Sequence, residues 1–316
     1  MNSTSPQPLV SIGIPTYNRA NGKLLNVIRR ALEQTYQNVE VIVSDNCSSD
    51  NTTEVVQSVK DERLKYVRHE TNIGANNNFN HCLKEARGEY FLLFHDDDMI
   101  DVDFVASCIA SLEEGKAVGA IFTGIRIIDG DDNVLNENKN MAKGKSPLEF
   151  VLAWFDAQIS LYLPSTLYNT EYLKKVGGFN SKTYMYPDLV PTFKLIAAYE
   201  RSDVEDVKAS FRRHDSNLGL SCHVDAWMED GLHVLDILYE LFPNDIDVLK
   251  DKGKKYFCQR MYKHASSEPN VFKRYRSYLK IYRAFDYCYS PIKYFYGNEF
   301  FKRFFAKIFR ISSFKK

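Results

Sequence analysis

Three consecutive carboxylates in His95-Asp96-Asp97-Asp98 come just after the apolar segment Tyr90-Phe91-Leu92-Leu93-Phe94. Adjacent carboxylates repel one another, and a bound cation relieves that repulsion. Carboxylate oxygens on a loop suit Mg²⁺ or Mn²⁺ and leave coordination positions open for phosphate oxygens. Most acidic runs are only solvated loops, but an uninterrupted apolar segment is typical of a central parallel strand, at whose end ligands bind. The cluster is therefore predicted to hold a divalent metal, Mn²⁺ or Mg²⁺.

Two further polar clusters stand at equivalent places in the chain. Pro15-Thr16-Tyr17-Asn18-Arg19 follows the apolar run 9–14, and Asp45-Asn46-Cys47-Ser48-Ser49-Asp50 follows the β-branched run 39–43. The carboxyl ends of parallel strands line one edge of a sheet. Three clusters that are distant in the sequence are therefore expected to meet in one crevice.

The elements that must position these clusters alternate between strand and helix. Strands are predicted at 9–14, 39–43, 64–67 and 90–94, and helices at 24–32, 51–59 and 76–86. Repeated βα units of this kind predict an α/β fold with a mostly parallel sheet flanked by helices. Beyond residue 98 the pattern loosens: helices are predicted at 102–112, from Ser146 and at 170–176, and strands at 118–123 and 208–212. From about Val224 onward the chain is predicted to be helical.

Composition and missing motifs exclude several function classes. The chain has 316 residues with 41 basic and 41 acidic side chains, so its formal net charge is zero and no nucleic-acid partner is expected. None of its 6 cysteines forms a CxxC pair, which argues against a zinc site. The N-terminus lacks an apolar signal region, and no apolar run reaches about 18 residues, so we expect a cytoplasmic protein. The first strand is followed by no GxGxxG turn and no Gly-rich basic loop, which excludes a nicotinamide enzyme and a nucleotidyltransferase.

Four motifs in order resemble glycosyltransferase family 2, whose members have the GT-A fold. They are Val10-Ser11-Ile12-Gly13-Ile14-Pro15-Thr16-Tyr17-Asn18, Val41-Ile42-Val43-Ser44-Asp45-Asn46-Cys47-Ser48-Ser49-Asp50, Asn72-Ile73-Gly74, and Ala86-Arg87-Gly88-Glu89-Tyr90 leading into the acidic cluster. Each motif alone is weak, but four in order are specific. The resemblance covers about residues 9–220. It implies an inverting enzyme with a nucleotide-diphospho-sugar donor, commonly a UDP-sugar, and a divalent metal.

The resemblance also implies roles for single residues. Those expected to bind the nucleotide-sugar near the first three motifs are Pro15, Thr16, Tyr17, Arg19, Asp45, Asn72 and Gly74. Asp45 would accept a hydrogen bond from the base, although it could instead cap the following turn. At the acidic cluster the family pattern is Asp-x-Asp-Asp, with His95 here in the first position. Asp97 and Asp98 are expected to bind the metal and Asp96 the donor, while the role of His95 stays open.

Downstream, Gly177-Gly178-Phe179-Asn180 and Tyr186-Pro187-Asp188 resemble the segment that carries the family's catalytic base. Pro187 replaces the usual Glu, and Asp188 is retained as the expected base that takes the acceptor proton. Asp188 could also serve as the N-cap of a helix over 189–199. Arg212 and His214 are expected to approach the diphosphate, although His214 could be an ordinary loop histidine.

These expectations divide the chain into two regions. Residues 1–222 would form the glycosyltransferase domain, with 9–98 as its nucleotide-sugar half and 99–222 as its acceptor half, and residues 223–316 a helical C-terminal region. The tail 292–316 has the pattern of a basic amphipathic helix, which could lie on an anionic membrane beside a lipid-linked acceptor or pack against protein.

The expected function is therefore metal-dependent, inverting sugar transfer to a hydroxyl acceptor, a saccharide or lipid-linked saccharide, in bacterial surface polysaccharide or glycolipid assembly. The alternative is a non-catalytic nucleotide-sugar-binding protein, with His95 and Pro187 marking a degraded site. Trp154 and Tyr162 could form an acceptor platform or could pack in the core.

Overall fold

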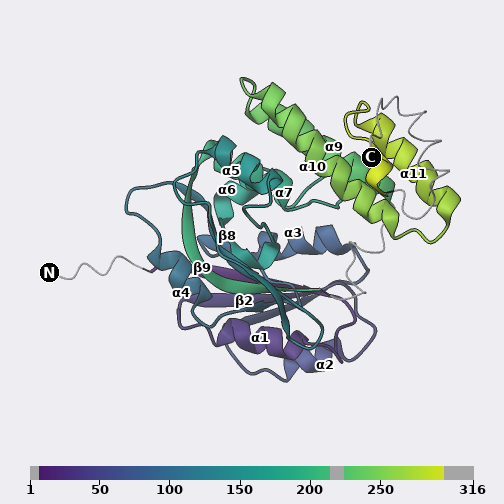
Figure 1. Ribbon diagram of the computed structural model, residues 1–316. Coiled ribbons are helices and arrows are strands. Elements are labelled where there is room, and N and C mark those ends of the chain that lie inside the picture. Colours follow the sequence, from purple (N-terminus) through teal and green to yellow (C-terminus); the bar gives the residue numbers. More distant parts are fainter. Residues whose placement is uncertain (1–6, 214–223, 295–316) are drawn as a thin grey trace. The chain divides into compact units, whose positions relative to one another are not determined.

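A computed structural model describes residues 7–213 and 224–294 of the chain (Figure 1). The chain forms two compact units, Met1–Leu220 and Ser221–Lys316. The predicted α/β class and the predicted helical C-terminal region are both confirmed. Among the described residues, no helix is both long and apolar enough to cross a membrane.

The first part of the larger unit is a parallel βα array. Its elements are β1 (Val10–Thr16), α1 (Leu24–Leu32), β2 (Val39–Asp45), α2 (Thr52–Gln57), β3 (Leu64–Arg68), α3 (Ala75–Glu85) and β4 (Tyr90–Leu93). The strands lie in the order β3-β2-β1-β4, and all three pairings are parallel. Every residue of β1, β2 and β4 is buried, as their uninterrupted apolar runs predict for central strands.

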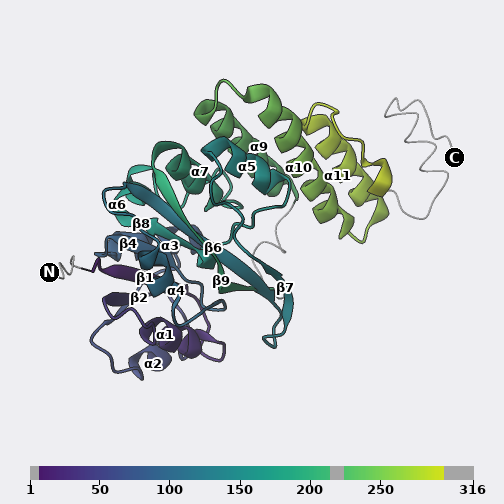
Figure 2. The same ribbon diagram turned by 60° about the vertical axis from the view of Figure 1, so that its left-hand side comes forward.

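The second part extends the same sheet with antiparallel pairings, except that β6 and β9 run parallel (Figure 2). Its elements are β5 (Met99–Ile100), α4 (Phe104–Ala110), β6 (Val118–Ile128), β7 (Val134–Asn138), α5 (Pro147–Phe155), the 3₁₀ helix η1 (Leu163–Ser165), β8 (Thr166–Asn169), α6 (Thr170–Lys175), α7 (Leu189–Ala198) and β9 (Glu200–Arg212). Beyond β4 the order is β8-β6-β9-β5, and β7 pairs with β6. Because β8 runs antiparallel to both β4 and β6, the sheet is mixed, where a mostly parallel sheet was expected.

Helices cover both faces of the sheet. On one face, Leu24, Val27 and Ile28 of α1 pack with apolar residues of β1, β2 and α4 in one buried cluster. On the other face, α3 lies close to β1, because a Cβ added at Gly13 would be 2.7 Å from Cβ of Cys82. Glycine is required there by this close approach of helix to strand.

Local signals account for some helix starts better than others. The helix predicted from Ser146 begins with a capping box: the Ser146 hydroxyl accepts from the Glu149 amide, and the Glu149 carboxylate accepts from the Ser146 amide. At the start of α2, the side chain of the N-cap residue Asn51 makes no cap hydrogen bond. Asp50 replaces it by accepting from the Thr52 amide at 3.1 Å.

The smaller unit contains three long helices and a 3₁₀ turn in its described part. They are α9 (Val224–Leu241), α10 (Ile246–Ser266), α11 (Val271–Ala284) and η2 (Pro291–Tyr294). Its core is aromatic: Phe257, Tyr262 and Tyr278 are almost completely buried, and the rings of Tyr262 and Tyr278 meet edge to face.

Candidate functional site

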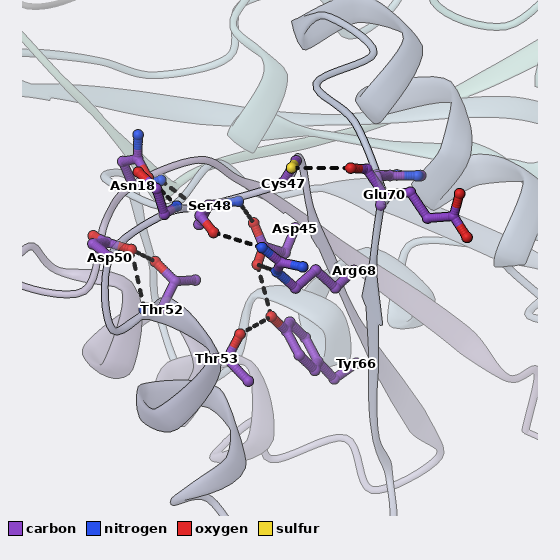
Figure 3. Close-up of polar contacts among 12 residues, drawn as sticks. Asn18, Asp45, Cys47, Ser48, Asp50, Thr52, Thr53, Tyr66, Arg68 and Glu70 are labelled. Carbon is purple, nitrogen blue, oxygen red and sulfur yellow. Dashed lines mark hydrogen bonds and ion pairs between the residues drawn. The ribbon is translucent and has the colours of Figure 1, made fainter.

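The loops that follow β1 and β2 hydrogen-bond directly to each other (Figure 3). The Asn18 amide donates to the Ser48 hydroxyl, and the Asn18 side-chain oxygen accepts from the Ser49 amide, each at 2.8 Å. The Ala20 amide donates to the Asp50 carboxylate at 3.0 Å. These contacts bring the first two predicted clusters together at one sheet edge.

Asp45 is completely buried at the end of β2. One of its oxygens accepts from the Ser48 amide at 2.9 Å, and the other accepts from the Tyr66 hydroxyl at 2.7 Å, with Arg68 nearby at 3.6 Å (Figure 3). Burial, with the Asp45 charge adding to it, raises the pKa of Tyr66 to about 12, so the phenol remains a donor. Both carboxylate oxygens are thus engaged by the protein, and Asp45 supports the loop over residues 45–50.

Asn46, which the sequence did not single out, connects this loop to the predicted residues Asn72 and Gly74. The Asn46 side chain donates to the Asn72 side-chain oxygen at 2.9 Å and accepts from the Ile73 amide at 2.8 Å. Gly74 then starts α3 with a φ of 83°, a conformation that favours glycine. Asn72 and Gly74 therefore lie at the same edge as the first two clusters.

Arg19 links the β1 loop to the acidic cluster. Its guanidinium lies 3.5 Å from an oxygen of Asp96 and 3.9 Å from an oxygen of Asp97. Burial, together with the charge of Asp97, raises the pKa of Asp96 to about 7 against the opposing effects of Thr16 and Arg19. The third predicted cluster thus joins the other two, and Pro15 and Thr16 lie buried beneath them at the end of β1 while Tyr17 is exposed.

His95, Asp97 and Asp98 offer ligand atoms that all lie within 4.8 Å of one another. In the described part of the chain, the Nε2 atom of His95 and one carboxylate oxygen of Asp98 are buried without a hydrogen-bond partner. Burial lowers the pKa of His95, which favours the neutral ring with a lone pair, and burial beside Asp97 raises the pKa of Asp98. Buried polar atoms normally find partners, so a cation would satisfy this group. The side chains present therefore fit a divalent metal.

Arg212, predicted to approach the diphosphate, is bound inside the protein instead. It is 2% exposed, and its guanidinium donates to the backbone oxygens of Asp97 at 2.6 Å and Asp129 at 2.7 Å. It also forms an ion pair with Asp132 at 2.5 Å, and its backbone amide donates to Asp98 at 2.9 Å. The position of Arg212 at a strand end could not show this, because the carbonyl and carboxylate oxygens that bind its side chain come from distant parts of the sequence. His214 lies outside the described residues.

The segment before Asp188 is fastened to α3. Asn80 accepts from the Phe179 amide at 2.9 Å, and the side chains of Asn76 and Asn80 both donate to the Phe179 carbonyl at 2.8 Å. Asparagine is a poor helix former, so the run Asn76-Asn77-Asn78 inside a predicted helix could have indicated that these side chains form hydrogen bonds with other segments.

Asp188 itself is half-buried just before α7. Its side chain makes no cap hydrogen bond to that helix, contrary to the N-cap alternative. Burial raises the pKa of Tyr168, and the nearby charge of Asp188 adds to this rise.

Of the two residues that could form an acceptor platform, Trp154 and Tyr162, the structure assigns Trp154 to the core. Trp154 is buried and its ring contacts Phe155 and Phe193 at centroid distances of 5.2 and 5.4 Å, so it belongs to the core. Tyr162 is less buried, and its ring lies 4.8 Å from that of Phe211.

Solved structures share this arrangement of elements. Staphylococcus aureus TarS, solved with UDP-GlcNAc, superposes with a TM-score of 0.59 at 18% identity, covering 88% of this chain and 90% of that chain. The mannosyltransferase PcManGT of Pyrobaculum calidifontis, solved with GDP-Man and Mn²⁺, gives 0.53 at 17% identity, covering 97% of this chain and 88% of that chain. At such identities the likeness shows a common fold, that of GT-A glycosyltransferases.

Sequence comparison gives the family. The chain is 27% identical over 281 residues to the GalNAc(5)-diNAcBac-PP-undecaprenol beta-1,3-glucosyltransferase of Campylobacter jejuni, covering 86% of each protein. It is 30% identical over 136 residues to the putative teichuronic acid biosynthesis glycosyltransferase TuaG of Bacillus subtilis, covering 42% of this chain and 53% of that protein. The family model described as glycosyl transferase family 2 matches residues 11–175, more than half of the chain. The strand-end clusters and the His-Asp-Asp group therefore belong to an enzyme, and this chain is a member of glycosyltransferase family 2.

Proposed function

We propose that this glycosyltransferase moves a sugar, with inversion, from a UDP-sugar to a hydroxyl of a lipid-linked saccharide during bacterial glycan assembly. The observation that carries the proposal is the convergence of the three strand-end loops on the partly buried group of His95, Asp97 and Asp98. TarS was solved with UDP-GlcNAc, and the Campylobacter relative is named for an undecaprenol-linked acceptor. Both support the donor and the acceptor class.

Asp97 and Asp98 would hold a divalent cation, Mn²⁺ or Mg²⁺, and His95 would be a third ligand. A bound cation of this kind supplies charge stabilisation to the leaving diphosphate. The unpartnered atoms of His95 and Asp98 support this assignment, as does the Mn²⁺ with which PcManGT was solved. The Arg212 guanidinium holds the backbone of Asp97 in place by donating to its carbonyl oxygen.

The donor would lie along the loops after β1, β2 and β3. Tyr17 is 47% exposed and offers an aromatic face, while the guanidinium of Arg19, 37% exposed, lies beside Asp96 and Asp97. Arginine suits recognition of phosphate oxygens through its planar set of donors. Asp45 would act on the base through the loop that it supports, because its side chain is completely buried.

Asp188 would take the proton of the acceptor hydroxyl as the new glycosidic bond forms. A carboxylate in this role must be within hydrogen-bond reach of that hydroxyl when the substrates are bound. The hydrogen bonds from Asn76 and Asn80 to Phe179 fix the segment that leads to Asp188, which supports a positioned base.

A turnover assay tests the proposal. The protein is incubated with a panel of nucleotide-sugars, Mn²⁺ or Mg²⁺ and a lipid-linked saccharide, and release of nucleotide diphosphate is measured. Asp97→Asn should lose both Mn²⁺ binding and turnover. Asp188→Asn should keep Mn²⁺ and donor binding but lose about 100-fold or more in kcat, as expected for a lost general base.

Asp131→Asn is a matched control, because Asp131 is an exposed acid on the β6–β7 turn. This variant should behave like the parent enzyme. Donor binding without nucleotide release in every acceptor mixture would favour the non-catalytic alternative. A normal kcat in Asp188→Asn would show that Asp188 is not the general base.

The tail 292–316 would hold the enzyme on the inner face of the cytoplasmic membrane, near a lipid-linked acceptor. Its six basic residues beyond position 300 alternate with aromatic residues in the sequence. Removing Phe300 to Lys316 should weaken flotation with anionic liposomes. Unchanged flotation would show that the tail is not the anchor.

A further inference from the structure

Charge is segregated between the helices of the smaller unit. The sequence of α9 contains five acidic residues and no lysine or arginine. The sequence of α11 contains no acidic residue and has five basic ones: Lys273, Arg274, Arg276, Lys280 and Arg283. One helix of this unit is therefore strongly cationic.

The outer face of α11 combines cations with exposed apolar side chains. Phe272, Arg276, Leu279 and Arg283 follow one another at helical spacing and lie on one face. Phe272 is 80% exposed and Leu279 is 37% exposed, whereas the tyrosines Tyr275 and Tyr278 on the inner side are buried. Val271, 39% exposed, adjoins Phe272, so apolar side chains group beside the cations, as on surfaces that contact a membrane or a partner.

The cations of this face are largely available to a partner. Lys280 forms an ion pair with Asp225 at 2.7 Å. Within residues 7–213 and 224–294, neither Arg276 nor Arg283 takes part in an ion pair. The face can therefore meet an anionic surface without first breaking internal salt bridges.

The chain's own tail is a poor occupant of this face. Residues 295–316 contain six lysines and arginines and one acid, Glu299, so they carry the same sign of charge as α11. Like charges repel at short range, and both segments would instead be attracted to the same anionic partner.

We propose that the outer face of α11 binds an anionic lipid surface, with Phe272 and Leu279 entering the headgroup region and Arg276 and Arg283 contacting lipid phosphates. The exposed phenylalanine and leucine favour lipid over nucleic acid, because a nucleic-acid backbone offers them no apolar environment. This surface is made of other residues than the tail 292–316 and does not depend on the sugar-transfer reaction.

Flotation of the full-length protein with phosphatidylcholine vesicles, with and without phosphatidylglycerol, tests the proposal. The parent protein should bind only the anionic vesicles. Arg276→Gln/Arg283→Gln should bind them about 25-fold more weakly, at about fivefold for each cation near an anionic surface. Phe272→Ser should bind roughly tenfold more weakly through the loss of apolar contact.

Arg29→Gln/Lys60→Gln is the matched control, because it removes two exposed cations from the larger unit and changes the net charge equally. It should bind vesicles like the parent, and all variants should keep the parent melting temperature. Unchanged flotation of the α11 variants would overturn the proposal, since the intact tail would then suffice. So would equal binding to neutral vesicles, no binding to any vesicle, or α11-dependent binding to duplex DNA or RNA in place of vesicles.

Discussion

Replacing Arg212 by glutamine distinguishes a structural role from the diphosphate-binding role that its sequence position suggests. In the structure the Arg212 guanidinium is bound to the backbone oxygens of Asp97 and Asp129 and to the Asp132 carboxylate. A residue bound in this way should matter for the stability of the folded protein before any donor is present. A residue that binds the diphosphate should matter only when the donor is bound.

The magnitude follows from the contacts that are lost. Hydrogen bonds from a charged donor contribute about 1.5–3 kcal/mol each, and two of them reach the backbone oxygens of Asp97 and Asp129 in partly buried positions. The Asp132 side chain is 51% exposed and can be hydrated again, so its ion pair adds little. We therefore expect a loss of about 3 kcal/mol or more in the free energy of unfolding. For a domain of this size the melting temperature should fall by roughly 6–12 °C.

The assay is thermal unfolding of the parent and variant proteins without donor or metal, followed by titration with Mn²⁺. Arg212→Gln should melt earlier and bind Mn²⁺ more weakly, because the backbone of Asp97 loses its support. Arg213→Gln is the control: the neighbouring side chain is exposed, and the change should stay within about 0.5 kcal/mol. A variant at position 212 that melts like the parent but has a raised KM for the donor would refute the structural role.

Three further predictions concern the rest of the larger unit. Burial alone would raise the pKa of Glu40, but hydrogen bonds from Ser11 and Arg87 outweigh burial and lower that pKa. Ionised Glu40 therefore stabilises the folded protein at pH values above the ordinary pKa of a glutamate, and this contribution is lost as the pH falls through the pKa of Glu40 in the folded state. In urea unfolding at a series of pH values, the free energy of unfolding should fall at acid pH in the parent and fall less in Glu40→Gln. Identical pH profiles for the two proteins would contradict this role of Glu40. Gly88→Ala should cost about 1–3 kcal/mol in the same experiment, because the new Cβ would lie 2.8 Å from the Ser11 hydroxyl, and an unchanged unfolding midpoint would show that the strand can move aside. Mn²⁺ at about 100 times its Kd should stabilise the metal-free protein by about 2.7 kcal/mol in thermal unfolding, and the same gain in Asp97→Asn would argue against this metal site.

Uninterrupted or periodic apolar patterns allowed much of the first hundred residues to be predicted. The helix α1 begins and ends at the predicted residues, Leu24 and Leu32, since its apolar side chains recur at helical spacing. The strands β1, β2 and β4 were recognisable because buried parallel strands are apolar on both faces. The strand β8 was missed: it has four residues, and no local pattern shows that it inserts between β4 and β6.

Sequence alone was enough to place polar clusters at the ends of β1, β2 and β4, and so to predict that they meet, because parallel strands share one carboxyl edge. What each side chain does at that edge depends on the folded structure. There, both oxygens of Asp45 accept from Ser48 and Tyr66, and the side chain of Arg212 turns into the protein. The physical reason is that hydrogen-bond partners in a folded chain come from residues far apart in sequence, and no local pattern records which of them will be neighbours.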